Sequence, residues 1–393
     1  MKDNELRLSE NFSIRPNILL QHWTELLQDR YRHQEDGSPG KLEFNTFVRR
    51  VRVGFAGTVF KKLSYLVSLE AANLGRAYTD PLDGTVIKQG YPMTQPPDTP
   101  FANFGVLFQD AFLSLDLHPA FSIQAGIMAL PFARQTLQSP AHYISLDILT
   151  TSTTFATATQ TSNLRDTGVQ LKGILFDRLE YRMGVFQGIR QGPEITPERG
   201  SKNAPRLTGY LQCNVLDPEG GYAFAGQYFG HKNVLGIGTG FDFQDNDDAD
   251  AYWAGSAAAF ASIRLSGNEK NGGDTLDALV QFLHFHPGTT LPPAALLPGG
   301  VARQNDIGAE LGYYNRWLSA SVFGKFELRK ITDEDRTFQE ANMRIYGGGV
   351  KYFIAEDNAH VTFAYNRIET PDANPTTSNP GVQYVLALQL YYF

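Results

Sequence analysis

GVQYVLALQLYYF, residues 381–393, is the stretch of sequence that decides the fold. It is rich in β-branched and aromatic residues, which favour extended structure. Its length matches that of a tilted strand crossing a membrane, which needs about 9 to 11 residues. The stretch fits either the closing strand of a membrane-spanning barrel or one strand of a soluble β-protein, so the rest of the chain has to decide.

The composition favours the membrane-spanning alternative. Charged residues make up 19% and aromatic residues 12% of the 393 residues, and the chain contains 37 glycines and 21 prolines, so strand and turn formers dominate. No apolar run approaches the roughly 18 residues that a membrane-spanning helix requires, and the mean hydropathy is -0.28. A chain of this kind would cross a membrane as a closed barrel, which pairs every backbone polar group. The single cysteine, Cys213, excludes an internal disulfide framework.

Alternating side chains indicate which face of each strand meets lipid. Between residues 61 and 72, apolar residues occupy every second position from Leu63 to Leu69, and mostly polar residues lie between them. An apolar outer face and a polar inner face are typical of a barrel with a wet interior. In the preceding strand the same rule places on the outer face Phe47, Val51, Val53 and Phe55, and on the inner face Arg50, Arg52 and Gly54.

Strand-like runs follow one another along nearly the whole chain. The runs cover residues 12–24, 43–56, 61–72, 104–117, 121–130, 164–176, 179–190, 234–244, 252–265, 275–285, 306–314, 317–330, 342–354, 359–369 and 381–393, with a further run that ends at Cys213. Residues 19–28 fit a short amphipathic helix equally well. Short and long connections alternate, as in transmembrane barrels, where the short turns are periplasmic and the long loops external.

The number of spanning strands has to be even if both termini are periplasmic. Residues 222–230 form one more strand-like run, which brings the total to 17. We interpret Tyr222 to Gly230 as the run that does not span, within a longer periplasmic connection, residues 217–233. The prediction is an all-β, 16-stranded antiparallel transmembrane β-barrel over residues 12–393, preceded by an N-terminal periplasmic segment, residues 1–11. The chain begins without the apolar core of a signal peptide, so we expect that a leader was removed and that Met1 is not native.

Several motifs carry a resemblance to known proteins. Phe393, with two tyrosines before it, resembles the end of bacterial outer-membrane barrels, whose terminal aromatic residue is read by the insertion machinery. The motifs FVRRVRVG (47–54), GIMALPF (126–132), GVQLKG (168–173), YRMGVFQG (181–188) and LDPE (216–219) resemble the phosphate-selective porins O and P and their relatives. The resemblance spans nearly the whole chain and implies a trimeric 16-stranded porin whose third external loop, residues 131–163, folds into the lumen. That family often has a lysine where this chain has Ala129, so anion selectivity does not simply carry over.

Basic residues on the inferred inner face are candidates for pore lining and solute binding, because rings of Arg and Lys select anions and guanidinium holds phosphate with two hydrogen bonds. The candidates are Arg50, Arg52, Lys62, Lys172, Arg182, Arg206, Lys325 and Arg329, with Arg134 in the third loop. Acidic residues fall on the same face and make a mixed-charge lumen the alternative: Glu70, Asp110, Asp116, Glu180, Glu310 and Glu327. The third loop also contains a hydroxyl-rich tract, residues 150–162, which would suit neutral polar solutes.

The closing strand does not fit the alternation if Phe393 faces lipid. Leu386, Leu388 and Leu390 would then face the lumen, where a bulge, a packed segment or a partner would have to cover them. This feature keeps open a second hypothesis, a structural or plugged barrel that acts as a scaffold in an outer-membrane complex.

We therefore expect an outer-membrane porin of a bacterial cell, a water-filled channel for passive diffusion of small hydrophilic solutes. An anion or phosphate preference follows if Arg50, Arg52, Lys172 and Arg182 cluster at the narrowing. The expected partners are outer-membrane lipid and lipopolysaccharide, a homotrimer, and small hydrophilic or anionic solutes, with no nucleic acid. We expect no cofactor or metal, and no enzyme, because no Ser or Cys can be placed beside an activating base.

Overall fold

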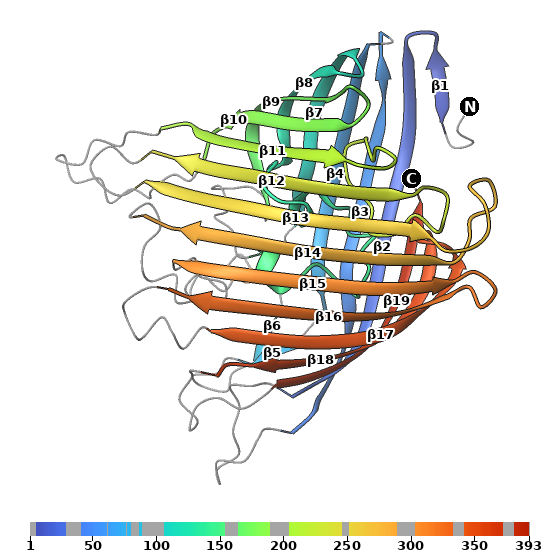
Figure 1. Cartoon of the computed structure of the whole chain (residues 1–393), viewed down its shortest axis with the longest axis vertical. Coiled ribbons are helices and arrows are strands. Elements are labelled where there is room, and N and C mark those ends of the chain that lie inside the picture. The colour runs from blue at the N-terminus through green and yellow to red at the C-terminus, as the bar shows by residue number, and fades with distance from the viewer. Residues whose placement is uncertain are drawn as a thin grey trace, which may run out of the picture.

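A closed ring of sixteen antiparallel strands forms the body of the chain in the computed structural model (Figure 1). The structure describes residues 5–28, 41–60, 62–75, 77–79, 86–88, 106–153, 164–188, 204–245, 251–288, 303–332, 342–371 and 381–392. The predicted fold class, including the number of spanning strands, is confirmed.

The elements follow one another in chain order around the ring. The strands of the ring are β2 (Phe12–Gln28), β3 (Glu43–Val59), β4 (Leu63–Leu74), β7 (Leu107–His118), β8 (Phe121–Ala129), β9 (Arg165–Leu175), β10 (Leu179–Phe186), β11 (Arg206–Asn214), β12 (Val234–Gln244), β13 (Tyr252–Arg264), β14 (Thr275–His286), β15 (Gln304–Asn315), β16 (Ala320–Ile331), β17 (Met343–Ala355), β18 (Ala359–Glu369) and β19 (Gly381–Tyr392). Outside the ring are β1 (Leu6–Ser9), the hairpin of β5 (Ala77–Thr79) and β6 (Val86–Lys88), and the 3₁₀ helices η1 (Gln135–Leu137) and η2 (Thr150–Thr153). Among the residues described, no helix is long and apolar enough to cross a membrane.

The ring closes between its first and last strands. β19 pairs with β2 in antiparallel register, with Leu388 opposite His22. β2 is extended over its whole length, so the alternative of a short helix over residues 19–28 is wrong. β1 pairs with β2 and stands beyond the end of β19, as Figure 1 shows. The division of the chain at residue 12 stays a prediction.

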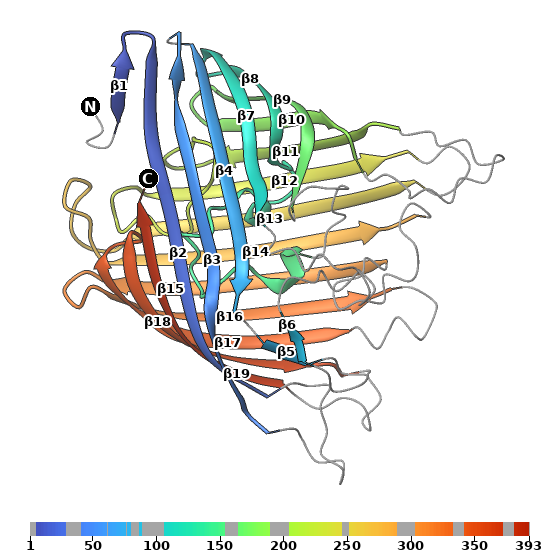
Figure 2. The ribbon, with the colours of Figure 1, turned by 180° about the vertical axis from the view of Figure 1, so that it is seen from behind.

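Short turns gather at one end of the barrel (Figures 1 and 2). The connections between the other ends of the strands lie mostly outside the described residues. The turn between β9 and β10 is a tight one, because Phe176 and Asp177 have φ angles of 53° and 54° and Arg178 N donates to Leu175 O. Two successive positive φ angles give the type I′ turn that suits the twist of a hairpin. By the rule for transmembrane barrels, this end is periplasmic.

The closing strand follows the simple alternation after all. Leu386, Leu388 and Leu390 point outward, with exposed fractions of 47%, 50% and 54%, whereas Val385 and Gln389 are buried inside. The expectation that these leucines face the lumen is wrong. It followed from the assumption that Phe393 faces lipid, and Phe393 lies outside the described residues. Exposed apolar side chains continue around the barrel, as on β14 and β16, and give it the outer band that faces lipid.

Candidate functional site

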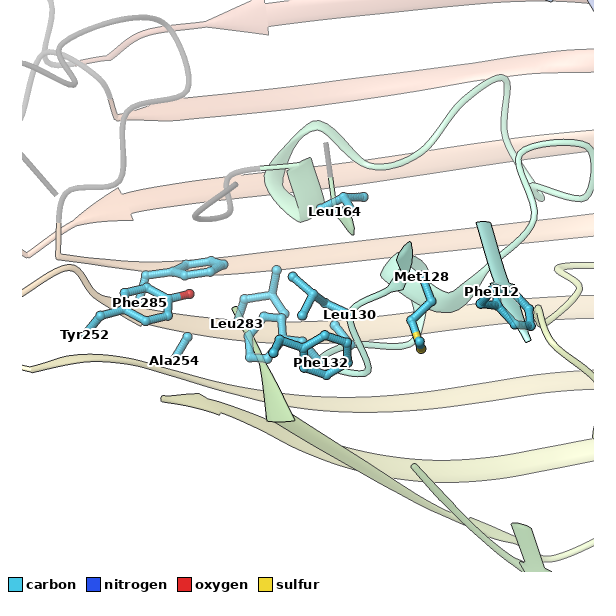
Figure 3. Packing of buried hydrophobic residues seen from close by; sticks show 11 residues of the cluster. Phe112, Met128, Leu130, Phe132, Leu164, Tyr252, Ala254, Leu283 and Phe285 are labelled. Carbon is cyan, nitrogen blue, oxygen red and sulfur yellow. The ribbon is translucent and has the colours of Figure 1, made fainter. Parts of the chain in front are cut away.

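The described part of the third loop, residues 131–153, folds into the barrel. At its start, Leu130 and Phe132 lie against Leu283 and Phe285 of β14 (Figure 3). The rings of Phe132 and Phe285 have centroids 5.8 Å apart, and all four side chains are buried. Burying an apolar side chain of this size contributes about 1.5 to 3 kcal/mol. The loop is thus fixed to the wall that β12 to β17 form.

A glycine allows the loop to approach this wall closely. A Cβ atom at Gly240 of β12 would lie 1.9 Å from the carbonyl oxygen of Phe132, so a larger residue does not fit there. The same oxygen accepts a hydrogen bond of 2.5 Å from Ser256 Oγ of β13. The backbone of the loop therefore rests directly on the sheet.

Carboxylates of the barrel wall hold the middle of the loop. Glu310 accepts hydrogen bonds from Gln135 Nε2 at 2.8 Å and from Ser145 N at 3.2 Å. Glu327 accepts one from Thr151 N at 2.9 Å and pairs with Lys325 Nζ at 2.9 Å. These acidic side chains face inward, as the alternation predicts, but the loop covers them.

The loop crosses to the opposite wall at its centre. Gln21 Nε2 of β2 donates to Pro140 O at 3.1 Å, and Gln389 Nε2 of β19 donates to Ala141 O at 2.9 Å. The third loop thus folds into the lumen, as the family resemblance implies, and contacts both walls. Of its hydroxyl-rich tract, residues 154–162 lie outside the described residues.

A second segment, residues 215–233 between β11 and β12, enters the lumen from the periplasmic end, and we call it the inner connection. Its Glu219 accepts hydrogen bonds from both terminal nitrogens of Arg134, at 2.7 Å for Nη2, and from the hydroxyl of Tyr228 at 2.7 Å. The side chains of Arg134 and Glu219 are 1% and 0% exposed. Burial opposes ionisation, but Arg134 outweighs it and holds the pKa of the Glu219 carboxyl below its ordinary value.

Backbone hydrogen bonds join the two insertions. Phe224 N donates to Leu137 O at 2.9 Å, Ser139 N donates to Phe224 O at 3.0 Å, and Gly226 N donates to His142 O at 2.7 Å. The prediction that residues 222–230 do not span is confirmed. The segment joins β11 to β12 at the periplasmic end, as predicted, and its contacts with the third loop inside the barrel are an addition that the sequence does not reveal.

Three adjoining cavities lie beside the insertions, along the wall from β2 to β10 and next to Tyr391 of β19. The outer one, of about 340 Å³, reaches Asn73 and Leu107 near the external strand ends. The middle one, of about 580 Å³, shares Arg52 and Arg165 with the outer one. The inner one, of about 410 Å³, shares Lys172 with the middle one and reaches the periplasmic turn after β7. Neighbouring cavities thus share lining residues from the external strand ends to the periplasmic turn.

A β-bulge builds the basic wall of the outer cavity. Arg49 has no residue opposite it, because Gln21 and His22 of β2 pair with Arg50 and Val48. The extra residue turns both Arg49 and Arg50 toward the interior. It also reverses the alternation on the other side of the bulge. Phe47, predicted to face lipid, is therefore only 3% exposed and lies inside the barrel.

Arginines outnumber carboxylates in the lining of the outer cavity. Arg50 Nε and Arg52 Nε both approach Glu70, at 3.3 and 2.9 Å, so two guanidinium groups share one carboxylate. Arg49 Nη2 pairs with Asp147 of the third loop at 2.6 Å. Asp147 also lies 3.7 Å from Arg50, so the three arginines of β3 pair with two carboxylates. Gln138 of the third loop lines the same cavity.

The predicted site residues separate into three groups. Arg50, Arg52 and Lys172 line the cavities. The second group is buried in ion pairs beneath the insertions or against the wall and consists of Arg134 with Glu219, Arg182 with Glu180, Arg206 with Asp242, Lys325 with Glu327 and Arg329 near Asp306. Lys62 is exposed in the turn between β3 and β4. The condition set for an anion preference, that Arg182 clusters with Arg50 and Arg52, is not met, because Arg182 pairs with Glu180 and lies under the inner connection.

Sequence reasoning missed Arg49 and Arg165, which also line the outer cavity. Arg165 begins β9 and pairs through Nε with Asp110 at 2.9 Å. The run of two adjacent arginines at 49 and 50 was the available signal of a bulge, since strict alternation would turn one of them toward lipid. Within the described ranges, no three His, Cys, Asp or Glu side chains lie close enough to hold a metal ion.

Comparisons with known proteins agree with this geometry at the level of fold. No family model and no curated protein matches the chain. Among solved structures, OprB of Pseudomonas putida is similar with a TM-score of 0.62 and 8% identity, over 97% of this chain and 94% of that one. The outer-membrane channel DcaP of Acinetobacter baumannii gives 0.57 and 9%, over 98% and 99%. Salmonella typhi OmpF, in complex with daunomycin, gives 0.56 and 10%, over 99% and 100%.

The expected resemblance to the phosphate-selective O and P porins in particular is not confirmed. The closed barrel, its apolar outer band and its similarity to these outer-membrane proteins place the chain in the bacterial outer membrane. The chain has the fold of the outer-membrane porins.

Proposed function

We propose that the chain forms a passive channel for small hydrophilic solutes with a preference for anions. The observation that carries this proposal is the row of three adjoining cavities along the wall from β2 to β10, which would form the path of the solute. Arg49, Arg50 and Arg52 pair with two carboxylates, Glu70 and Asp147, beside the outer cavity, which leaves one positive charge in excess. Fixed charges at a constriction select ions of the opposite sign.

Single-channel conductance of the folded protein in planar bilayers tests the proposal, with the reversal potential measured in a salt gradient. We expect a steady conductance, a reversal potential that favours chloride, and a lower chloride conductance when phosphate is added, because guanidinium groups bind phosphate more tightly than chloride. The absence of conductance above the leak would contradict the channel itself. A reversal potential that favours the cation would contradict only the anion preference.

The Arg52→Gln variant localises the selectivity. It removes one of the two guanidinium charges that share the Glu70 carboxylate, and it should lower the preference for chloride without abolishing conductance. Arg316→Gln is the matched control, because it removes the same charge from an exposed position in the turn between β15 and β16, away from the cavities. Equal shifts of the reversal potential in the two variants would show that net charge and not the narrowing sets the selectivity.

A closed barrel that serves as a scaffold is the second candidate function. The observation that favours it is the amount of lumen that the two insertions fill, with the Arg134 and Glu219 side chains excluded from solvent between them. The same conductance measurement separates the two candidates, because a scaffold barrel would show no conductance.

The assembly and the lipid partners are also part of the proposal. A homotrimer is supported by one similar structure, OmpT of Vibrio cholerae in a trimer form, with a TM-score of 0.50 and 10% identity. The apolar outer band supports contact with outer-membrane lipid and lipopolysaccharide. Chemical crosslinking of the protein in outer-membrane fragments should give a species of three chains, and a species of one chain only would contradict the trimer.

A further inference from the structure

The inner connection forms one side of the path on its periplasmic half. Tyr222 lines the middle cavity, and the preceding Gly221 lines both the middle and the inner cavities. The hydroxyl of Tyr222 donates to Asp110 Oδ1 of β7 at 2.5 Å and accepts from Ala129 N of β8 at 2.9 Å. Its ring packs against that of Phe112, with centroids 4.7 Å apart. The tyrosine therefore reaches from the inner connection to the wall of the barrel.

The wall holds this part of the segment from the other side as well. Lys172 Nζ of β9 donates to Gly221 O at 3.1 Å, and Arg182 Nη1 of β10 donates to Tyr222 O at 2.6 Å. Together with the ion pair of Glu219 and the backbone bonds of Phe224, these contacts fasten the segment to β7, β8, β9, β10 and the third loop. A segment held at so many points is a fixed part of the wall, because moving it would break several buried hydrogen bonds at once.

We infer that the inner connection is a second, fixed constriction and that Tyr222 sets the size limit of the path. This inference rests on the proposed function, because a size limit has meaning only for an open channel. The two constrictions then act on different properties of a solute. The arginines of β3 select for charge at the outer cavity, and the tyrosine of the inner connection selects for size below it.

The Tyr222→Ala variant tests the inference through the exclusion of polyethylene glycols of increasing size, measured as their effect on single-channel conductance. Removing the ring opens the middle cavity toward β7, so the conductance should rise about twofold and longer glycols should enter. Tyr352→Ala is the matched control, because Tyr352 lies on the lipid side of β17 with 56% of its surface exposed. It should keep the conductance and size limit of the wild type.

A shortened chain provides an independent test. Asp217 N donates to Asn233 O at 2.9 Å across the base of the inner connection, so a two-residue Asn-Gly turn can replace residues 218–232. Arg134→Gln is combined with this change, so that no guanidinium loses its counter-ion. This variant should exceed Tyr222→Ala in both conductance and size limit.

The outcomes separate the inference from the proposed function. Wild-type conductance alone decides whether the channel exists. An unchanged size limit in Tyr222→Ala would overturn the inference, even if the shortened chain failed to fold. A silent wild type together with a conducting shortened chain would also overturn it, because the segment would then be a plug that blocks the lumen and not a constriction beside an open path.

Discussion

Replacing Glu219 with glutamine should destabilise the barrel strongly. The amide keeps the size of the side chain and one acceptor oxygen, but the Arg134 guanidinium then lies buried without a counter-ion. Breaking a buried ion pair at one partner costs about 3 to 5 kcal/mol. Arg134 retains two neutral acceptors, Gln212 Oε1 at 3.2 Å and Ala225 O at 2.8 Å. We therefore expect the free energy of unfolding to fall by about 3 kcal/mol, at the lower end of this range.

Urea unfolding in phospholipid vesicles measures this loss through the fluorescence of the three tryptophans. The urea concentration at the unfolding midpoint should fall. The slope of the unfolding free energy against urea concentration should stay constant, because unfolding exposes the same surface in both proteins. The double variant Arg134→Gln with Glu219→Gln should recover part of the loss, since it buries no charge.

The control for this measurement is Glu369→Gln on β18. Its ion pair with Arg367 is solvent-exposed, with side chains 24% and 46% exposed, and such pairs contribute at most about 1 kcal/mol. A loss in Glu219→Gln no larger than the loss in Glu369→Gln would refute the reasoning. The two insertions would then be held by packing and backbone hydrogen bonds, without a contribution from their ion pair.

Two further changes test the same insertions. Burial opposes ionisation of Glu219 and Asp147, but their arginine neighbours hold the carboxyl pKa values below the ordinary 4.5 and 3.8. The two ionised carboxylates therefore stabilise the folded barrel fully at a pH above their pKa values in the unfolded chain. This stabilisation is lost as the pH falls through their lower pKa values in the folded barrel. The urea concentration at the unfolding midpoint, measured from pH 7 to pH 3, should therefore decrease once the pH is below about 4. The decrease should be less steep in Glu219→Gln, which lacks one of the two carboxyl groups. Gly240→Ala should cost about 1 to 3 kcal/mol, since its Cβ would meet Phe132 O at 1.9 Å, and should alter the conductance by displacing the third loop. Gly255→Ala on β13, whose Cβ meets nothing within 4 Å, should change neither thermal stability nor conductance.

The sequence carried enough information for the fold because strands alternate with a period of two and turns punctuate them. The run 359–369 coincides with β18, and 234–244 with β12. Two periplasmic termini then required an even number of spanning strands, and the connection lengths identified residues 222–230 as the run to remove from the count. These signals are local, so they can be read without knowing what packs against each strand.

The candidate site depended on contacts that local patterns do not record. The bulge at Arg49 reversed the phase of β3 for Phe47, because a single inserted residue exchanges the two faces of a strand. Arg182 and Arg206 point inward as predicted, yet both are fully buried, and the segments that cover them are distant in sequence. An inward direction therefore does not by itself make a side chain part of a pore.

The charge of the path follows from which inner-face groups the two insertions leave uncovered. The chain as a whole has a formal net charge of -7, and the third loop satisfies Glu310 and Glu327 with hydrogen bonds from Gln135, Ser145 and Thr151. On the opposite wall the loop leaves space, and there the bulge brings the arginines of β3 together. Because fixed charges act on a solute mainly at close range, the groups beside the narrowing outweigh the larger number of acidic groups elsewhere. An acidic protein can thus present a group of arginines on the wall of an inner cavity.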